Sequence, residues 1–476
     1  MNHPAAVPTA SRENVLEGLA DIVGARHVLS DPNDTEPFYE DWLHRTKGDA
    51  LCVCQPADTA EVAAVVAFCA ARGLPVFPQA GNTSSCGGSV PLPASGGVLL
   101  SVRRLNRVER VDPQNNAIIA GAGCVLADLK AAAAAEGRLF PLTLSSEGSC
   151  QIGGNVSTNA GGTAVLRYGT MRDLVLGLEV VLADGRIWDG LRTLRKDNTG
   201  YDMKALFVGS EGTLGIVTRV ALKLFPLPTL QATALVAVAS ADDAAALLRH
   251  CHGELGSSLD AFELLSASQL DIVCRHVPGN RNPLPGHPWY VLVDLQSAER
   301  SQDLTARLEA AIAGALEDGI VADAVVAQSG AQIEDIWRLR HSVSESNRRH
   351  GLNFTHDVGV PIAQIPEFLH RADAAVAEAF AQAEVFCVSH MGDGNVHYTV
   401  TFAHDTAEPA ALGARVTGMV HDIAMSLGGT FGAEHGVGQR YRASLRRYKS
   451  PVELDLFRSM KSALDPNGIL NPGKVL

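Results

Sequence analysis

The spacing of hydrophobic positions near the start of the chain predicts alternating strands and helices. Residues 51–54 form a short apolar run that is typical of a buried strand. The apolar positions that follow recur at i, i+3, i+4 and i+7, which predicts a helix with one buried face: Val62, Val65, Val66 and Cys69. Gly73 would end this helix, and Val76 and Phe77 would begin a second short strand. Residues 50–102 are therefore predicted to form a β-α-β unit.

The pattern changes after Pro226 and Pro228, where we place the first domain boundary. Strands at 232–238, 289–295 and 321–327, with helices at 241–250 and 302–316, predict an antiparallel sheet with helices on one face. Further helices are expected near 333–348, 363–381 and 412–427. The tail at 464–474 is rich in turn residues but ends apolar, so we expect it to dock on the body of the protein.

Three tracts of glycine and small residues occur at 78–88, 148–162 and 209–217. The first follows a predicted strand, and the third ends in one. Small residues expose successive backbone N–H groups, and a concave run of such groups binds phosphate oxygens. For the first tract alone, a flexible glycine loop explains the pattern equally well. It is not a P-loop, because no Gly-Lys-Ser/Thr follows. The Gly121-Ala122-Gly123 run lacks the third glycine of a dinucleotide fingerprint, where Leu126 stands, so a nicotinamide cofactor is disfavoured.

A pair of histidines stands out in the second half, His390 and His397. Gly392 and Gly394 between them disfavour a helix, because glycine lowers helix propensity by roughly 1 kcal/mol. The apolar run at 385–388 instead predicts a strand that ends at His390, followed by a tight turn and a second strand from His397. This arrangement would bring both imidazoles to one point.

Glu434 and His435 supply a carboxylate and a third imidazole further along the chain. Two histidines and one glutamate with an open coordination position form a ligand set for zinc or a similar divalent ion that meets a substrate. Any one of these histidines is more simply explained as a residue satisfied by ordinary hydrogen bonds. The whole constellation favours a metal site.

Composition narrows the range of functions. A chain of 476 residues is too long for one core, and its formal charge of −13 disfavours nucleic acid and anionic membranes as partners. Its apolar runs are too short to span a membrane, and Met1–Pro4 does not begin a signal sequence. Nine cysteines without a framework indicate reduced thiols in a cytoplasm. Cys52 and Cys54 are close enough for a zinc knuckle, although strand positions explain them more simply.

These motifs, with the dense stretch at 141–226 that includes LRKDNTGYD at 194–202, resemble a known family. The chain is similar to flavin dehydrogenases of the vanillyl-alcohol-oxidase type that act on D-2-hydroxy acids. It is most like the D-2-hydroxyglutarate dehydrogenases, followed by the D-lactate dehydrogenases and glycolate oxidase subunits. The resemblance implies an α+β fold with a two-lobed FAD-binding domain (1–226) and an inserted antiparallel-sheet substrate domain with the metal site (227–432). A C-terminal segment (433–476) would return to the FAD domain.

The resemblance also implies which residues hold the cofactor. FAD would be non-covalent, because Asn82 and Thr83 occupy the loop where covalently flavinylated relatives attach the ring. The implied FAD contacts are Pro78, Gln79, Ala80, Gly81, Asn82, Thr83, Ser84, Gly87, Ser89, Pro141, Gly148, Ser149, Gly153, Gly154, Asn155, Ser157, Thr158, Gly161, Gly212, Ile216 and Asn471.

For the chemistry, the resemblance assigns His390, His397 and Glu434 as metal ligands, with zinc favoured over manganese, and His435 as the catalytic base. Substrate would be bound by Arg340, Ser344, Thr355, His356, His390 and His435. Thr355 departs from the family, where a lysine stands, so we expect a weaker hold on a distal carboxylate. The implied reaction oxidises D-2-hydroxyglutarate or a D-lactate-like acid to the 2-oxo acid by hydride transfer to flavin N5.

The reduced cofactor would pass its electrons to an electron-transfer flavoprotein, a quinone or a cytochrome, among which the sequence does not choose. A homodimer and a peripheral position at the inner membrane stay open. Two other classes also stay open: a zinc-dependent hydrolase, which would need no flavin, and a non-catalytic flavin-binding protein, which would need no metal set.

Overall fold

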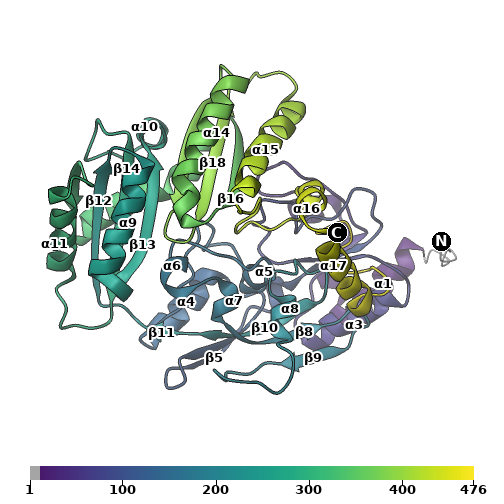
Figure 1. Ribbon diagram of the computed structural model, residues 1–476. Coiled ribbons are helices and arrows are strands. Elements are labelled where there is room, and N and C mark those ends of the chain that lie inside the picture. The colour runs from purple at the N-terminus through teal and green to yellow at the C-terminus, as the bar shows by residue number, and fades with distance from the viewer. Residues whose placement is uncertain (1–10) are drawn as a thin grey trace. The chain divides into compact units, whose positions relative to one another are not determined.

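The computed structural model describes residues 11–476, so the prediction about Met1–Pro4 lies outside the described residues. The chain divides into two compact units (Figure 1). Unit 1 comprises the described residues up to Ala160, Thr170–Pro226 and His435–Leu476, and unit 2 comprises Gly161–Gly169 and Leu227–Glu434. Sequence analysis places residues 161–169 in the first domain. The structure corrects this, because Arg167 in that segment bonds to Asp260 and to the carbonyl of Gln296, both in unit 2.

Unit 1 contains a small, partly parallel sheet with the strand order β1-β2-β4-β3. Its strands are β1 (Val28–Leu29), β2 (Cys52–Cys54), β3 (Val76–Gln79) and β4 (Val98–Ser101). The predicted β-α-β unit is confirmed, with α3 (Thr59–Ala70) between β2 and β3, capped by the Asp58 carboxylate. Cys52 and Cys54 are buried strand residues, which favours the strand interpretation over a zinc knuckle. Helices α1 (Arg12–Val23) and α2 (Pro32–Tyr39) precede this unit.

A second sheet in unit 1 has the order β5-β6-β10-β8-β9, and all of its neighbouring strands are antiparallel. The strands are β5 (Val108–Asp112), β6 (Ala117–Gly121), β8 (Val175–Val181), β9 (Ile187–Gly190) and β10 (Ile216–Lys223). The associated helices are α4 (Leu126–Ala135), α5 (Ile152–Ser157), α7 (Met171–Leu174) and α8 (Lys204–Phe207), and β7 (Arg138–Leu139) pairs with β11 (Phe225–Pro226). The second glycine-rich tract is thus partly helical rather than an extended loop, because α5 occupies its centre.

The C-terminal part of unit 1 contains α16 (Arg442–Tyr448) and α17 (Pro451–Leu464), which sequence analysis misses. The expected docking of the tail is seen. Val76 of β3 donates its N–H to the carbonyl of Ile469, and Asn471 returns a 2.8 Å bond to the carbonyl of Val76. The last residues therefore extend the edge of the first sheet.

Unit 2 is built on a seven-stranded antiparallel sheet with the order β15-β12-β14-β13-β17-β18-β16. The strands are β12 (Leu230–Val238), β13 (Leu259–Ser266), β14 (Trp289–Ser297), β15 (Asp323–Val326), β16 (Leu352–Gly359), β17 (Glu384–His390) and β18 (Asn395–Phe402). Sequence analysis misses β13 and β16. Both carry buried polar residues that break the apolar pattern, and both lie beside the candidate site.

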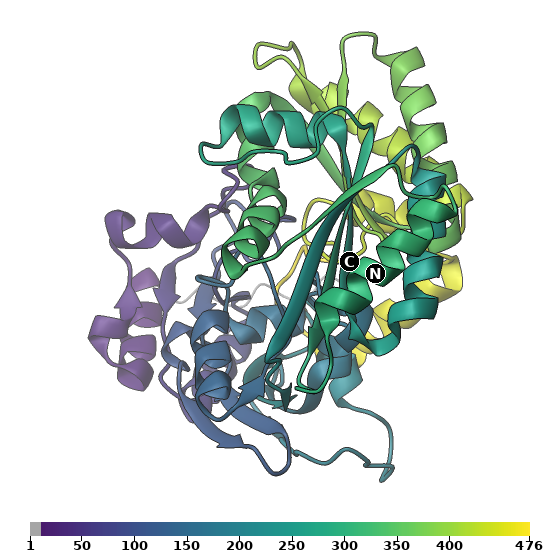
Figure 2. The same ribbon diagram turned by 90° about the vertical axis from the view of Figure 1, so that its left-hand side faces the viewer.

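Helices cover both faces of this sheet, which corrects the prediction of a single covered face (Figure 2). The helices on one face are α9 (Ala241–Leu255), α11 (Leu304–Glu317), α14 (Ile365–Ala379) and α15 (Pro409–Ser426). Those on the other face are α10 (Ala267–His276) and α12 (Gly330–His341). Successive residues of β12 point to opposite faces and are apolar on both, so Val236 packs in one core and Leu235 in the other.

The long helix predicted at 333–348 is in fact two helices, α12 and α13 (Val343–His350), separated at Ser342. The segment 161–169 contributes α6 (Val165–Tyr168) to unit 2. Short 3-10 helices occur at Ala25–His27, Val102–Arg104, Gly256–Ser258 and Ile362–Gln364. Within residues 11–476, no helix has both the length and the apolar character needed to cross a membrane.

Candidate metal site and flavin-binding loop

The hairpin of β17 and β18 positions the two histidines, as predicted. The turn closes with a bond from the N–H of Asp393 to the carbonyl of His390. Gly394 adopts φ +91°, and a Cβ there would lie 2.5 Å from the carbonyl oxygen of Val360, so only glycine fits this turn. The rings of His390 and His397 meet edge to face, with centroids 5.2 Å apart.

Glu434 completes a three-residue cluster with these histidines. Its Oε1 lies 3.2 Å from Nε2 of His397, and one potential ligand atom of each residue lies within 4.8 Å of the others. Asp357, which faces His397 across the β16–β18 pair, accepts a 3.0 Å bond from the backbone N–H of Glu434. The three predicted ligands therefore meet in unit 2, although they come from different parts of the chain.

Glu263 is a residue of this site that sequence analysis misses. It lies in β13 opposite His390, is 1% exposed, and accepts a 2.7 Å bond from Nδ1 of His390. Its other oxygen accepts a 2.6 Å bond from Nε of Arg340, whose Nη2 lies 3.3 Å from Nε2 of His390. Burial alone would raise the pKa of Glu263, but His390 and Arg340 outweigh it and lower the pKa to about 2. A carboxylate inside an apolar stretch was the available signal, because a buried charge needs a partner.

The predicted substrate residues do not all reach this cluster. Arg340 does, whereas Ser344 lies exposed on α13, beyond the break at Ser342. Arg340 and Ser344 therefore do not lie on one continuous helix, although a single helix was predicted at 333–348. Thr355 lies on the same face of β16 as Asp357, and its hydroxyl is 3.1 Å from that of Thr399.

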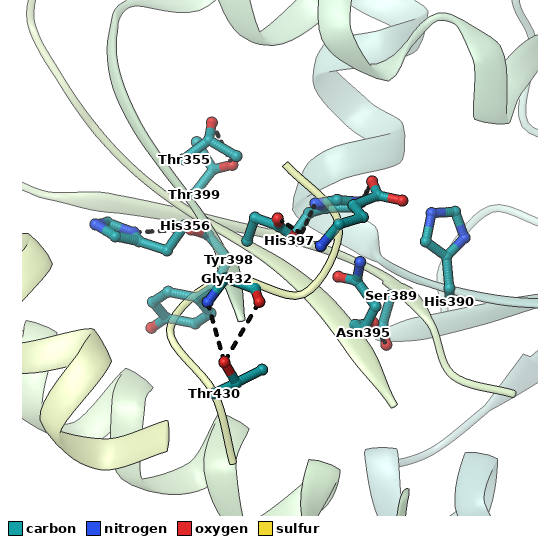
Figure 3. Close-up of polar contacts among 12 residues, drawn as sticks. Thr355, His356, Ser389, His390, Asn395, His397, Tyr398, Thr399, Thr430 and Gly432 are labelled. Atoms are coloured by element: carbon teal, nitrogen blue, oxygen red, sulfur yellow. Dashed lines mark hydrogen bonds and ion pairs between the residues drawn. The ribbon is translucent and has the colours of Figure 1, made fainter. Parts of the chain in front are cut away.

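His356 points away from the cluster (Figure 3). It is fully buried, with Nδ1 3.0 Å from the carbonyl of Tyr398 and Nε2 3.2 Å from the hydroxyl of Thr417 in α15. Neighbouring strand residues face opposite sides of a sheet, so Thr355 and Asp357 face the metal cluster while His356 faces the helices. The structure therefore contradicts a substrate contact by His356.

His435, the predicted base, begins the C-terminal return of the chain to unit 1. The loop that follows it is held by Glu211, another residue that sequence analysis does not identify. The two oxygens of Glu211 accept bonds of 2.7 and 2.8 Å from the N–H groups of Val437 and Gly438. Glu211 thereby fixes the backbone two and three residues after His435.

The first glycine-rich tract of unit 1 forms a preorganised loop after β3. Asn82 has φ +54°, and its amide donates a 2.8 Å bond to the carbonyl of Glu40. The hydroxyl of Ser84 accepts bonds from the N–H groups of Cys86 and Gly88. Across the described part of the chain, the backbone N–H groups of residues 82–85 have no protein acceptor. Such a row of free donors fits the oxygens of a diphosphate, as in FAD.

The three glycine-rich tracts meet in unit 1. A Cβ on Gly81 would lie 2.4 Å from the carbonyl oxygen of Ser149, and one on Gly212 would lie 2.5 Å from Cγ of Pro78. Any side chain at either position would overlap these atoms, so only glycine allows the segments to pack this closely. All the implied FAD residues lie in unit 1 except Gly161, which belongs to unit 2 and approaches Glu434.

Comparison with known proteins supports the assignment of a flavin-binding domain. Residues 50–190 match the family "FAD binding domain", and residues 227–475 match "FAD linked oxidases, C-terminal domain". The chain belongs to the FAD-linked oxidase family. It is thus an FAD-dependent oxidoreductase. A mitochondrial D-2-hydroxyglutarate dehydrogenase from Bos taurus is 37% identical over 464 residues, covering 98% of this chain and 84% of the relative. A D-2-hydroxyglutarate dehydrogenase from Xanthomonas citri pv. viticola is 34% identical over 460 residues, covering 96% of each.

A solved structure supports the fold of this FAD-linked oxidase. That of p-cresol methylhydroxylase with substrate bound has a TM-score of 0.77 at 14% identity, covering 99% of this chain and 98% of the other. The predicted α+β fold of the vanillyl-alcohol-oxidase type is confirmed.

Proposed function

We propose that this FAD-linked oxidase converts a D-2-hydroxy acid, D-2-hydroxyglutarate or a D-lactate-like acid, to the 2-oxo acid with help from a divalent metal. The names of the relatives support the substrate class. The observation that carries the metal is the convergence of His390, His397 and Glu434 within 4.8 Å.

The charge around the cluster favours a divalent cation. Glu263, Asp357 and Glu434 are carboxylates, and the guanidinium of Arg340 is bonded to Glu263. With neutral imidazoles, these four groups carry two more negative than positive charges, and Asp393 in the turn adds a further carboxylate, so the surroundings attract a cation. Two imidazole nitrogens and one carboxylate oxygen favour zinc over manganese. Metal binding displaces protons from the ligands.

The chemistry divides among the residues as follows. A 2-hydroxy acid chelates a cation through its carboxylate and hydroxyl oxygens, and a metal here would supply Lewis acidity that lowers the pKa of the hydroxyl. His435 would accept the hydroxyl proton, and Arg340 would bind a substrate carboxylate. FAD would supply an acceptor, flavin N5, for the hydride that leaves C2 of the acid as the hydroxyl becomes a carbonyl. A flavoprotein, quinone or cytochrome would then accept the electrons.

Anaerobic mixing with D- and L-2-hydroxy acids tests this function, with flavin absorbance as the readout. We expect bleaching by D-2-hydroxyglutarate or D-lactate and none by the L-acids. Absence of bleaching with every acid of the panel would exclude the proposal.

The role of the metal is tested in the same assay. Chelator treatment, or His397→Ala, should remove the metal and abolish bleaching while FAD stays bound. His404→Ala, at an exposed histidine of the same unit, is the control and should bleach normally. A His397→Ala protein that lacks metal but still bleaches at the normal rate would show that the reaction needs no metal.

A further inference from the structure

We propose that Glu263 is the positioning residue of the active site: it fixes His390 as a metal ligand through Nδ1 and holds Arg340 through Nε. This inference rests on the proposed metal site. Glu263 would touch neither the metal nor the substrate. It would couple the metal ligand His390 to the substrate-binding Arg340.

The first step concerns the tautomer of His390. The Nδ1–H of a neutral imidazole is held by Oε1 of Glu263 at 2.7 Å, so the lone pair lies on Nε2. A carboxylate behind a histidine in this way orients the ring and increases its basicity as a ligand. Nε2 of His390 is therefore the atom prepared for the metal.

The second step concerns Arg340. Its Nη2 lies 3.3 Å from Nε2 of His390, which is the atom assigned to the metal, whereas its Nε is bonded to Oε2 of Glu263 at 2.6 Å. A divalent ion on Nε2 repels the guanidinium and would displace Nη2, but the bond at Nε can persist. Glu263 thus retains Arg340 at the site while its Nη nitrogens turn to a substrate carboxylate.

A glutamine at this position separates the two roles. Its side chain has the same shape but only one acceptor oxygen, and its NH₂ group can only donate. If the NH₂ group faces His390, Nδ1 must accept, Nε2 carries the proton, and the ring cannot bind a metal. If it faces Arg340, two donors oppose each other in a buried site. Either arrangement loses one function that the carboxylate supports.

Asp260→Asn is the matched control. Asp260 lies three residues before Glu263 in the same strand, is 5% exposed, and is also paired with an arginine, 3.2 Å from Nη1 of Arg167. The control therefore removes one buried carboxylate charge and one ion pair from β13 and leaves the bonds of Glu263 in place.

The experiment measures zinc affinity by competition with a chromogenic chelator in FAD-loaded protein, with FAD content as a second readout. We expect Glu263→Gln to weaken zinc binding by roughly 10- to 100-fold with FAD content unchanged, and Asp260→Asn to stay within about twofold of wild type. Glu263→Asp keeps the charge but cannot reach both partners, so it should fall between them. It also serves if Glu263→Gln fails to fold.

Arg340→Met provides the second arm. We expect normal zinc affinity, because the bond between Glu263 and His390 remains, and a rise in KM for the 2-hydroxy acid that exceeds the fall in kcat. Zinc affinity of Glu263→Gln within twofold of wild type, together with an unchanged KM for the 2-hydroxy acid, would overturn the inference and leave the proposed function standing. A wild-type protein that binds no zinc would remove the metal site and this inference together.

Discussion

At the scale of single residues, strand alternation decides which side chains share the site. Thr355 and Asp357 face the metal cluster from β16, and His356 between them faces the helices. A motif of three consecutive polar residues therefore supplies two site residues and one core residue. The difference matters most for Thr355, whose neutral hydroxyl stands where the family resemblance implies a lysine.

Thr355→Lys should shift the enzyme toward the dicarboxylic substrate. A charged hydrogen bond to a carboxylate contributes roughly 1.5–3 kcal/mol, so the ratio of kcat/KM for D-2-hydroxyglutarate to that for D-lactate should rise about ten- to a hundredfold. Thr355→Val, which has a similar shape without the hydroxyl, is the control and should not raise this ratio. If the wild-type enzyme already accepts only hydroxyglutarate, another group replaces the lysine and the argument fails.

His435→Ala should slow flavin reduction by roughly 10²–10⁴-fold, the usual contribution of general acid–base catalysis, while metal content is retained. Stopped-flow absorbance measures the rate, and metal analysis checks the site. His404→Ala should be normal in both. An unchanged reduction rate would remove His435 from the role of base.

At the scale of elements, the flavin-binding loop depends on close approach between backbones. Gly81 packs against the carbonyl oxygen of Ser149, so residues 78–89 and the tract before α5 form one surface. The orientation of the free N–H groups at residues 82–85 depends on this packing. Local sequence is explained equally well by a flexible loop and by a ligand-binding loop, and contact with the second tract orders the loop.

Gly81→Ala should greatly weaken FAD binding, because the new Cβ would overlap backbone atoms that cannot move independently. Gly148→Ala is the comparison, since a Cβ there has no protein atom within 4 Å. That variant should fold as stably as wild type, and a loss of FAD affinity in it would place Gly148 against the cofactor. Fluorescence titration of the apoprotein gives both affinities. Normal FAD affinity in Gly81→Ala would contradict the packing argument.

At the scale of the whole molecule, buried charges make stability depend on pH. In unit 2, burial and the nearby Asp294 raise the pKa of Asp260 from 3.8 to about 6, against the opposing effect of Arg167. The folded state therefore binds this proton more tightly than the unfolded state does. The contribution of Asp260 to the free energy of unfolding therefore falls as pH rises from about 4 to about 6, and it is constant above that pH.

This predicts a pH-dependent difference between wild type and Asp260→Asn. As pH rises from 4 to 6, the free energy of unfolding of wild type should fall relative to the variant by up to about 3 kcal/mol, at 1.36 kcal/mol per pKa unit. Urea unfolding at several pH values measures it. A difference that does not change between pH 4 and 6 would contradict the raised pKa.

FAD should dissociate from the protein when the protein is denatured. The resemblance implies a non-covalent flavin, because Asn82 and Thr83 occupy the expected attachment loop, so acid denaturation should release FAD to the supernatant. Flavin that remains with the precipitated polypeptide would show that another residue binds it covalently.

The sequence by itself determined the family, the β-α-β start and the β17–β18 hairpin with its two histidines. These features depend on local patterns: helical periodicity, turn chemistry between glycines, and motifs of a few residues. The sequence also located the glycine-rich tracts. They can be recognised because only a run of small residues leaves successive backbone N–H groups exposed.

Only the tertiary structure decided which residues complete the sites. The contact between Glu263 and His390 joins residues 127 positions apart through the pairing of β13 with β17, which no local pattern specifies. The transfer of residues 161–169 to unit 2, the break between α12 and α13, and the burial of His356 depend likewise on long-range packing. Local sequence determines which segments can form, whereas the register of distant strands determines which side chains meet.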